Sequence, residues 1–242
     1  MSYIQDNIKH ILTRIERACL ANHRDPKEVR LLLATKTVPA QRIRMALETG
    51  QTLIGENKVQ EIKEKYAAIC DLTPTNHFIG HLQTNKIKDI LKYNVSCIHS
   101  VDRIDLATKL HQRLALENKT MDVLIQVNTS NEESKFGVAP KDTIKLIEQV
   151  AMLNTLHIKG LMTIGLFSAE EDKIRACFNL LKTIQQQVLD LNIPHVEMKE
   201  LSMGMSGDLE IAIAEGATIV RVGTAIFGER IYPDSYFWNE NN

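Results

Sequence analysis

The sequence of 242 residues lacks an apolar run long enough to span a membrane. It also lacks a strong charge of either sign: the net charge of −1 provides no electrostatic footprint for nucleic acid or an anionic membrane. The N-terminal stretch spaces its isoleucines as one face of a helix, with charged residues between them, and so has no continuous apolar core of a signal peptide. We therefore expect a cytoplasmic protein with neither a nucleic-acid nor a membrane partner.

Motifs for metal binding and nucleophilic catalysis are also missing. His77 and His81 have H-x-x-x-H spacing, but we expect them to bracket a strand, and no glutamate follows the first histidine, so we predict no metal site. No Ser-His-Asp set or nucleophile elbow is present, and we assign no catalytic residue. The cysteines are far apart and form no CxxC pair, which favours reduced thiols in a cytoplasmic protein: Cys19, Cys70, Cys97 and Cys177.

Strands and helices alternate along the whole chain after a first amphipathic helix. No linker interrupts the pattern, so we expect residues 1–242 to form a single domain. Eight strands in a chain of this length favour a closed (β/α)8 barrel, the TIM-barrel fold, and the alternative is an open doubly wound sheet. The predicted strands are 31–35, 52–57, 77–80, 95–100, 121–128, 158–164, 200–204 and 218–228.

The first strand, in LLLATKTVP, ends in a lysine. Side chains alternate along a strand, so Leu32, Ala34 and Lys36 share one face. If that face looks into the barrel, Lys36 is an amine at the mouth of a largely apolar interior. Desolvation lowers the pKa of such an amine and makes it a nucleophile toward carbonyls. From this stretch alone, a solvated surface lysine is the alternative.

In a (β/α)8 barrel the functional groups lie at the C-terminal ends of the strands, and the last two loops often hold a phosphate. LSMGMSGD, after the seventh strand, is small, contains glycine and leads into a helix that begins near Asp208; RVGTAIFG supplies Gly223 and the Thr224 hydroxyl. Ordinary turn chemistry is the alternative for either loop. The strand-end residues are Lys36, Glu56, Asn57, His81, Asn128, Thr163, Ser202, Gly204 and Gly223.

Arg221 lies inside an otherwise apolar strand, on the same face as Gly223. A guanidinium keeps its proton and must find an acceptor. Two interpretations follow: a structural partner inside the barrel, either a carboxylate or a carbonyl, or an acceptor on a bound ligand.

The sequence closely resembles the pyridoxal 5′-phosphate (PLP) homeostasis proteins, a family that shares the barrel of the alanine racemase N-terminal domain. Matching segments follow one another from the first strand to the eighth, which is more specific than any one motif. A small departure is Gly207, where an acidic or small residue is usual. The segments are LLLATKTVP, LIGENKVQE, HFIGHLQTNK, HSVD, LIQVNTSNEESKFG, GLMTIG and LSMGMSGDLEIAIAEGATIVRVGTAIFG.

The resemblance implies a cofactor and roles for individual residues. Lys36 would form the internal aldimine with PLP, and Arg221 would face the pyridine nitrogen. The last two loops would hold the phosphate, and two further residues would form walls. The predicted cofactor-binding residues are Lys36, Asn57, Ser202, Met203, Gly204, Arg221, Gly223 and Thr224, with Asn57 and Met203 as the walls.

Three functions are compatible with these residues: a PLP carrier or regulator in PLP homeostasis, a PLP-dependent amino-acid racemase, and a phosphosugar enzyme or Schiff-base aldolase. Arg221 cannot protonate the pyridine nitrogen, so the ring would be a poor electron sink. This disfavours most PLP enzymes but not racemases of this barrel type, which the family comparison gives an arginine too. Family comparison gives alanine racemases a second, β-rich domain with a catalytic tyrosine, whereas this chain ends after the eighth strand. We therefore expect a PLP-binding protein that is not an enzyme, with one open cofactor face.

A carrier of this kind would deliver PLP to PLP-requiring apo-enzymes. No heptad seam or long apolar surface stripe is apparent, so we expect a monomer. Lys135, in the loop SNEESKFG, is a candidate second amine for release of the cofactor, and a solvated loop lysine is the alternative. The sequence leaves open how Gly207 affects the phosphate loop.

Overall fold

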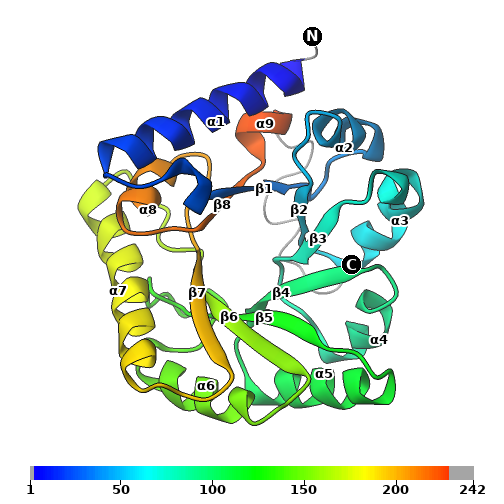
Figure 1. Cartoon of the computed structure of the whole chain (residues 1–242), viewed down its shortest axis with the longest axis vertical. Helices are drawn as coiled ribbons and strands as arrows, with labels where there is room; N and C mark the ends of the chain where they lie inside the picture. The colour runs from blue at the N-terminus through cyan, green and yellow to red at the C-terminus, as the bar shows by residue number, and fades with distance from the viewer. Residues whose placement is uncertain (1–2, 229–242) are drawn as a thin grey trace.

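Eight parallel strands close into a barrel at the centre of the molecule (Figure 1). The computed structural model describes residues 3–228. Each strand pairs with the next, and the last strand pairs with the first, which confirms the closed barrel and excludes the open sheet. The strands are β1 (Arg30–Ala34), β2 (Leu53–Glu56), β3 (Thr75–Phe78), β4 (Val95–Val101), β5 (Met121–Gln126), β6 (Leu156–Met162), β7 (Val196–Ser202) and β8 (Ile219–Val222).

Helices surround the barrel and cover its outer face (Figure 1). Within residues 3–228, β8 is followed only by the four-residue helix α9, too short to cover its side of the barrel. The helices are α1 (Tyr3–Ala21), α2 (Ala40–Leu47), α3 (Val59–Ile69), α4 (Ile87–Ile90), α5 (Ile104–Leu116), α6 (Thr143–Ala151), α7 (Glu171–Asp190), α8 (Leu209–Ala214) and α9 (Thr224–Phe227).

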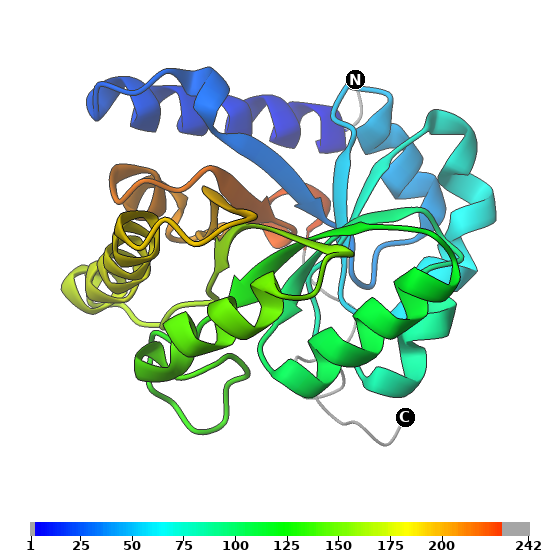
Figure 2. The ribbon, with the colours of Figure 1, turned by 60° about the horizontal axis from the view of Figure 1, so that its bottom comes forward.

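Helix α1 fills the gap that the short α9 leaves in the outer ring. It packs against α8, α9 and α2, and runs along the outer edge of the barrel as the dark blue helix in Figure 2. Ile4, Ile8, Ile11 and Ile15 recur at helical spacing and are all buried. The predicted amphipathic helix is thus confirmed, and its apolar stripe completes the layer of helices.

The alternation of side chains in β1 separates two hydrophobic regions. Leu31 and Leu33 belong to the large core between the strands and the helices, whereas Leu32 packs in a small cluster with Leu53 and Ile219. Leu32 is also the register partner of Arg221. Leu32 therefore lies on the side of β1 that faces the barrel interior, which meets the condition that the sequence left open for this strand.

Several predicted strand boundaries are wrong. Strand β7 covers Val196–Ser202 instead of 200–204, and β6 covers Leu156–Met162 instead of 158–164. Strand β8 ends at Val222 instead of continuing to 228, because Gly223 caps helix α9 and the apolar run after it is helical. Strand β3 begins at Thr75, whose N–H donates to Thr52 O, so that polar residues 75 and 76 pair with β2. His77 therefore lies inside β3 rather than at its first position, and His81 lies beyond its end, so the two histidines do not bracket the strand.

No helix within residues 3–228 is long and apolar enough to cross a membrane. All four cysteines are free thiols in the structure, as the sequence predicts.

Candidate functional site

Lys36 lies just beyond the C-terminal end of β1, in a turn. The strand ends at Ala34, and one further ladder bond joins the Thr35 N–H to Gly55 O at 2.9 Å. Lys36 itself is partly buried. The next residue, Thr37, has a φ of 63°, which is unusual for a β-branched side chain. The lysine therefore stands in a strained turn between β1 and α2.

A buried polar group lies behind this turn. The Lys65 ammonium donates to Thr35 O at 2.9 Å, to Glu56 Oε1 at 2.8 Å and to Glu61 Oε2 at 2.6 Å. Glu61 Oε2 also accepts the Thr37 N–H at 2.6 Å. Burial raises the pKa of Glu56 to about 7, and the charge of Lys65 opposes the rise. Lys65 and Glu61 thus form hydrogen bonds to the backbone on both sides of Lys36, at Thr35 O and at the Thr37 N–H.

Arg221 extends into the barrel interior and is only 6% exposed. Its guanidinium donates to Ser202 Oγ at 2.9 Å and to Thr163 O at 2.8 Å. Both acceptors are neutral, and no ion pair of Arg221 with a carboxylate is seen within residues 3–228. Burial lowers the pKa of Arg221 to about 10, opposed by the charge of Asp208. The carbonyl partner that the sequence allowed is present, and no carboxylate of the described residues takes the place of the other.

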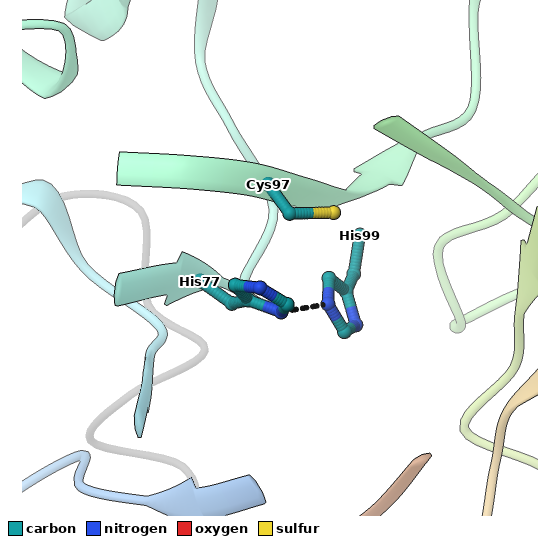
Figure 3. A group of neighbouring side chains, drawn as sticks. All are labelled: His77, Cys97 and His99. Atoms are coloured by element: carbon teal, nitrogen blue, oxygen red, sulfur yellow. Dashed lines mark hydrogen bonds between the residues drawn. The ribbon is translucent and has the colours of Figure 1, made fainter. Parts of the chain in front are cut away.

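The contact with Ser202 begins a chain of hydrogen bonds across the barrel. Ser202 Oγ lies 3.0 Å from His99 Nδ1, and His99 Nε2 lies 2.8 Å from His77 Nδ1 (Figure 3). Burial lowers the pKa of His77 to about 4 and that of His99 well below its usual value. Arg221 can only donate to Ser202, so the chain is satisfied when the serine hydroxyl donates to His99 and His99 donates to His77. Neutral dipoles aligned in this way stabilise the buried guanidinium charge.

The two histidines and Cys97 also form a compact group of possible metal ligands, with ligand atoms within 4.8 Å of one another. The histidine nitrogens that face each other already share a hydrogen bond. Burial raises the pKa of the Cys97 thiol, which opposes thiolate formation, and the charge of Arg221 disfavours a further cation near His99. This group is therefore better described as the end of the hydrogen-bond chain than as a metal centre. The H-x-x-x-H pair is split, because His81 is not in this group and stacks on Phe136.

The two predicted phosphate loops both need glycine. Gly204 has a φ of 92°, and a Cβ there would lie 2.5 Å from the Ala212 Cβ. A Cβ at Gly223 would lie 3.0 Å from Ala34 O, so the loop after β8 runs directly against the end of β1. The C-terminal ends of β1, β7 and β8 are thereby brought together, since the Arg221 N–H also donates to Gly204 O at 2.9 Å.

Helix α1 fastens both loops from outside the barrel. Arg14 pairs with Glu210 on α8 at 2.7 Å and donates to Ser206 O, within the loop after β7, at 3.1 Å. Asn7 donates to Ile226 O of α9 at 3.0 Å. The loops thus have a rigid support outside the site itself.

The remaining predicted site residues differ in what they can offer. The Met203 side chain is fully buried in the outer core, so only its backbone is available to a ligand. The Ser202 hydroxyl is engaged by Arg221 and His99. Thr224 is exposed at the start of α9. Asn57 is partly buried after β2, where a Cβ at Gly80 would overlap Asn57 O at 2.0 Å, so the third loop fits closely against it.

Lys135 is held in place by other parts of the loop region. Its ammonium donates to Gly165 O at 2.9 Å and forms an ion pair with Glu132. Both contacts oppose a role as a free second amine.

The sequence did not single out Lys65 or His99 as site residues. Lys65 follows Glu61 by four positions on a helix, a spacing that usually marks a solvated pair. His99 is a lone imidazole in an apolar strand, and its partners come from other strands. Two features of the sequence could have pointed to these residues. Lys65 lies on the apolar side of α3, one turn after Glu61, and His99 lies within the family segment HSVD.

The family model for the alanine racemase N-terminal domain matches residues 6–231 of the chain. A pyridoxal phosphate homeostasis protein of Pseudomonas aeruginosa is 43% identical over 232 residues, which cover 96% of this chain and 98% of the relative. Another, of Aquifex aeolicus, is 42% identical over 230 residues, which cover 94% and 98%.

Solved structures agree with this similarity. PipY of Synechococcus elongatus with PLP bound has a TM-score of 0.78 and 34% identity, and the match covers 88% of this chain and 99% of PipY. An alanine racemase of Clostridium difficile has a TM-score of 0.75, covering 95% of this chain and 58% of the racemase. At 13% identity, the racemase supports the fold alone.

The loop after β7 offers a matched pair of glycine substitutions. Gly204→Ala should lower the free energy of unfolding by about 2–4 kcal/mol, because the left-handed backbone and the contact with Ala212 both oppose a methyl group. Gly207→Ala meets no atom within 4 Å and should change it by less than about 0.5 kcal/mol. Urea unfolding followed by circular dichroism measures both. Equal stabilities of the two variants would contradict the assigned loop geometry.

Proposed function

The chain belongs to the family of the pyridoxal phosphate homeostasis proteins, and we propose that it binds PLP, attaches it covalently to Lys36 and delivers it to PLP-requiring apo-enzymes. The observation that carries the proposal is the buried Arg221 cation, whose hydrogen-bond partners are neutral. Arg221 lies on β8, which pairs with β1, the strand that leads to Lys36. Bound PLP in PipY, a relative of this fold and similar length, supports the choice of ligand.

The residues at the strand ends fit the three chemical groups of PLP. The aldehyde requires an amine, which Lys36 supplies at the end of β1. The phosphate requires closely approaching backbone N–H groups, and Gly204 and Gly223 leave the space for them. The pyridine nitrogen requires a donor or a proton source, and Arg221 is a donor that keeps its own proton.

PLP would supply an aldehyde that can condense with the Lys36 amine, with loss of water, and a ring that can withdraw electrons. Arg221 would orient the ring by donating to its nitrogen without protonating it, which would keep the ring a weak electron acceptor. The hydrogen-bond chain through Ser202 and His99 keeps the guanidinium aimed into the barrel. Backbone N–H groups near Gly204, Gly223 and Thr224 would hold the phosphate, and Asn57 and the Met203 backbone would line the wall.

A weak electron acceptor disfavours most reactions of PLP enzymes, although not racemisation on a barrel of this type. We therefore propose a monomeric cytoplasmic carrier with no committed reaction. A PLP-dependent racemase on the same barrel is the alternative. A racemase requires an acid or base on each face of the substrate, and the contacts of Lys135 with Gly165 O and Glu132 oppose its acting as the second one.

Replacing Lys36 tests covalent attachment. Wild-type protein loaded with PLP and reduced with borohydride should carry one adduct, which peptide mapping finds at Lys36. Lys36→Ala should lose that adduct while still binding the phosphate group non-covalently. Lys135→Ala is the control and should keep the adduct. An adduct found solely on another lysine would refute the assignment.

A transfer experiment tests delivery. PLP-loaded protein is mixed with a PLP-requiring apo-enzyme while a trap removes free PLP, and recovery of the apo-enzyme's activity is followed. Recovery should be faster than spontaneous release of PLP into the trap. Racemisation of a common amino acid at about one turnover per second or more would instead establish the enzyme.

A further inference from the structure

The turn that carries Lys36 is unusual in both its backbone and its support. Thr37 adopts a left-handed φ of 63°, which threonine seldom does. Strand β1 ends at Ala34, so the ladder reaches only Thr35. Something other than the sheet must therefore set the direction in which the Lys36 side chain leaves the backbone.

Helix α3 provides that support through Lys65. The three protons of its ammonium meet three acceptors, on Thr35, Glu56 and Glu61, at 2.6–2.9 Å. Glu61 in turn receives the N–H of Thr37. The carbonyl before Lys36 and the N–H after it are thus both tied to one side chain of α3 or its direct partner.

Burying this ion pair costs desolvation free energy, because Lys65 and Glu56 are only 9% and 5% exposed. Glu56 keeps one oxygen, Oε2, with no hydrogen-bond partner. Thr35 Oγ1 donates to its other oxygen at 2.7 Å. Buried ion pairs contribute little net stability, so stability alone is a poor explanation for this arrangement.

We propose that Lys65 is a positioning residue: with Glu56 and Glu61 it fixes the strained turn so that the Lys36 amine meets the cofactor's aldehyde. The inference rests on the proposed function, because it concerns attachment to Lys36. Lys65 takes no part in the condensation, in which the Lys36 nitrogen bonds to the aldehyde carbon and the aldehyde oxygen leaves as water.

The test separates attachment from binding. Apo-protein is mixed with PLP, samples are quenched with borohydride at intervals, and the rate of adduct formation at Lys36 is measured. The affinity for pyridoxine 5′-phosphate, which has no aldehyde, reports the rest of the pocket. Lys65→Met should slow adduct formation at least tenfold and change the pyridoxine 5′-phosphate affinity by less than twofold. Lys63→Met removes the same charge from an exposed position of α3 and should change neither.

A second pair of variants keeps the test informative if Lys65→Met does not fold. Glu61→Ala removes the acceptor for the Thr37 N–H and should also slow adduct formation. Thr37→Gly accepts the left-handed backbone without strain. The double variant Glu61→Ala with Thr37→Gly should form the adduct at least three times faster than Glu61→Ala alone. The effects of the two substitutions on the rate are then not additive.

Several results would overturn the inference. These are an unchanged adduct rate in Lys65→Met, an equal loss of pyridoxine 5′-phosphate affinity, or additive effects of Glu61→Ala and Thr37→Gly. Absence of a Lys36 adduct in the wild-type protein would instead refute the proposed function itself, so the two failures are distinguishable.

Discussion

The buried charge of Arg221 is the constraint on which the rest of the barrel interior depends. A guanidinium taken out of water must have its donors satisfied, and a carboxylate partner would neutralise it. This chain uses a serine hydroxyl and a backbone carbonyl instead. The serine is then aligned by His99, and His99 by His77, so residues from four strands cooperate to hold one cation that keeps its full charge.

At the C-terminal end of the barrel, too, the residues that would contact a ligand are held in position by other residues that would not contact it. Lys65 on α3 holds the turn around Lys36, and α1 ties down the loops after β7 and β8. Helix α1 can do so because it occupies the place of a full-length last helix. The packing that completes the outer layer thus also fixes the loops proposed to bind phosphate.

The sequence predicts the barrel well, because alternating strands and helices are a local pattern that repeats eight times. It also identifies Lys36 and Arg221, since a charged residue at the end of one apolar strand and inside another is unusual. The predicted C-terminal end of β8 is wrong, because the pattern of a short apolar run such as Thr224–Phe227 is compatible with a strand or a helix. Lys65 and the chain to His77 were missed, because their meaning depends on contacts between distant elements, and nothing local predicts a left-handed Thr37.

The protonation state of the pyridine nitrogen tests the central claim most directly. Protein loaded with PLP labelled with ¹⁵N in the ring can be examined by nitrogen NMR near neutral pH. Arg221 cannot give up its proton to the ring, so the account predicts the chemical shift of an unprotonated pyridine in the wild-type protein. Arg221→Glu should move the signal toward that of a protonated ring. A pyridinium signal in the wild-type protein would contradict the account.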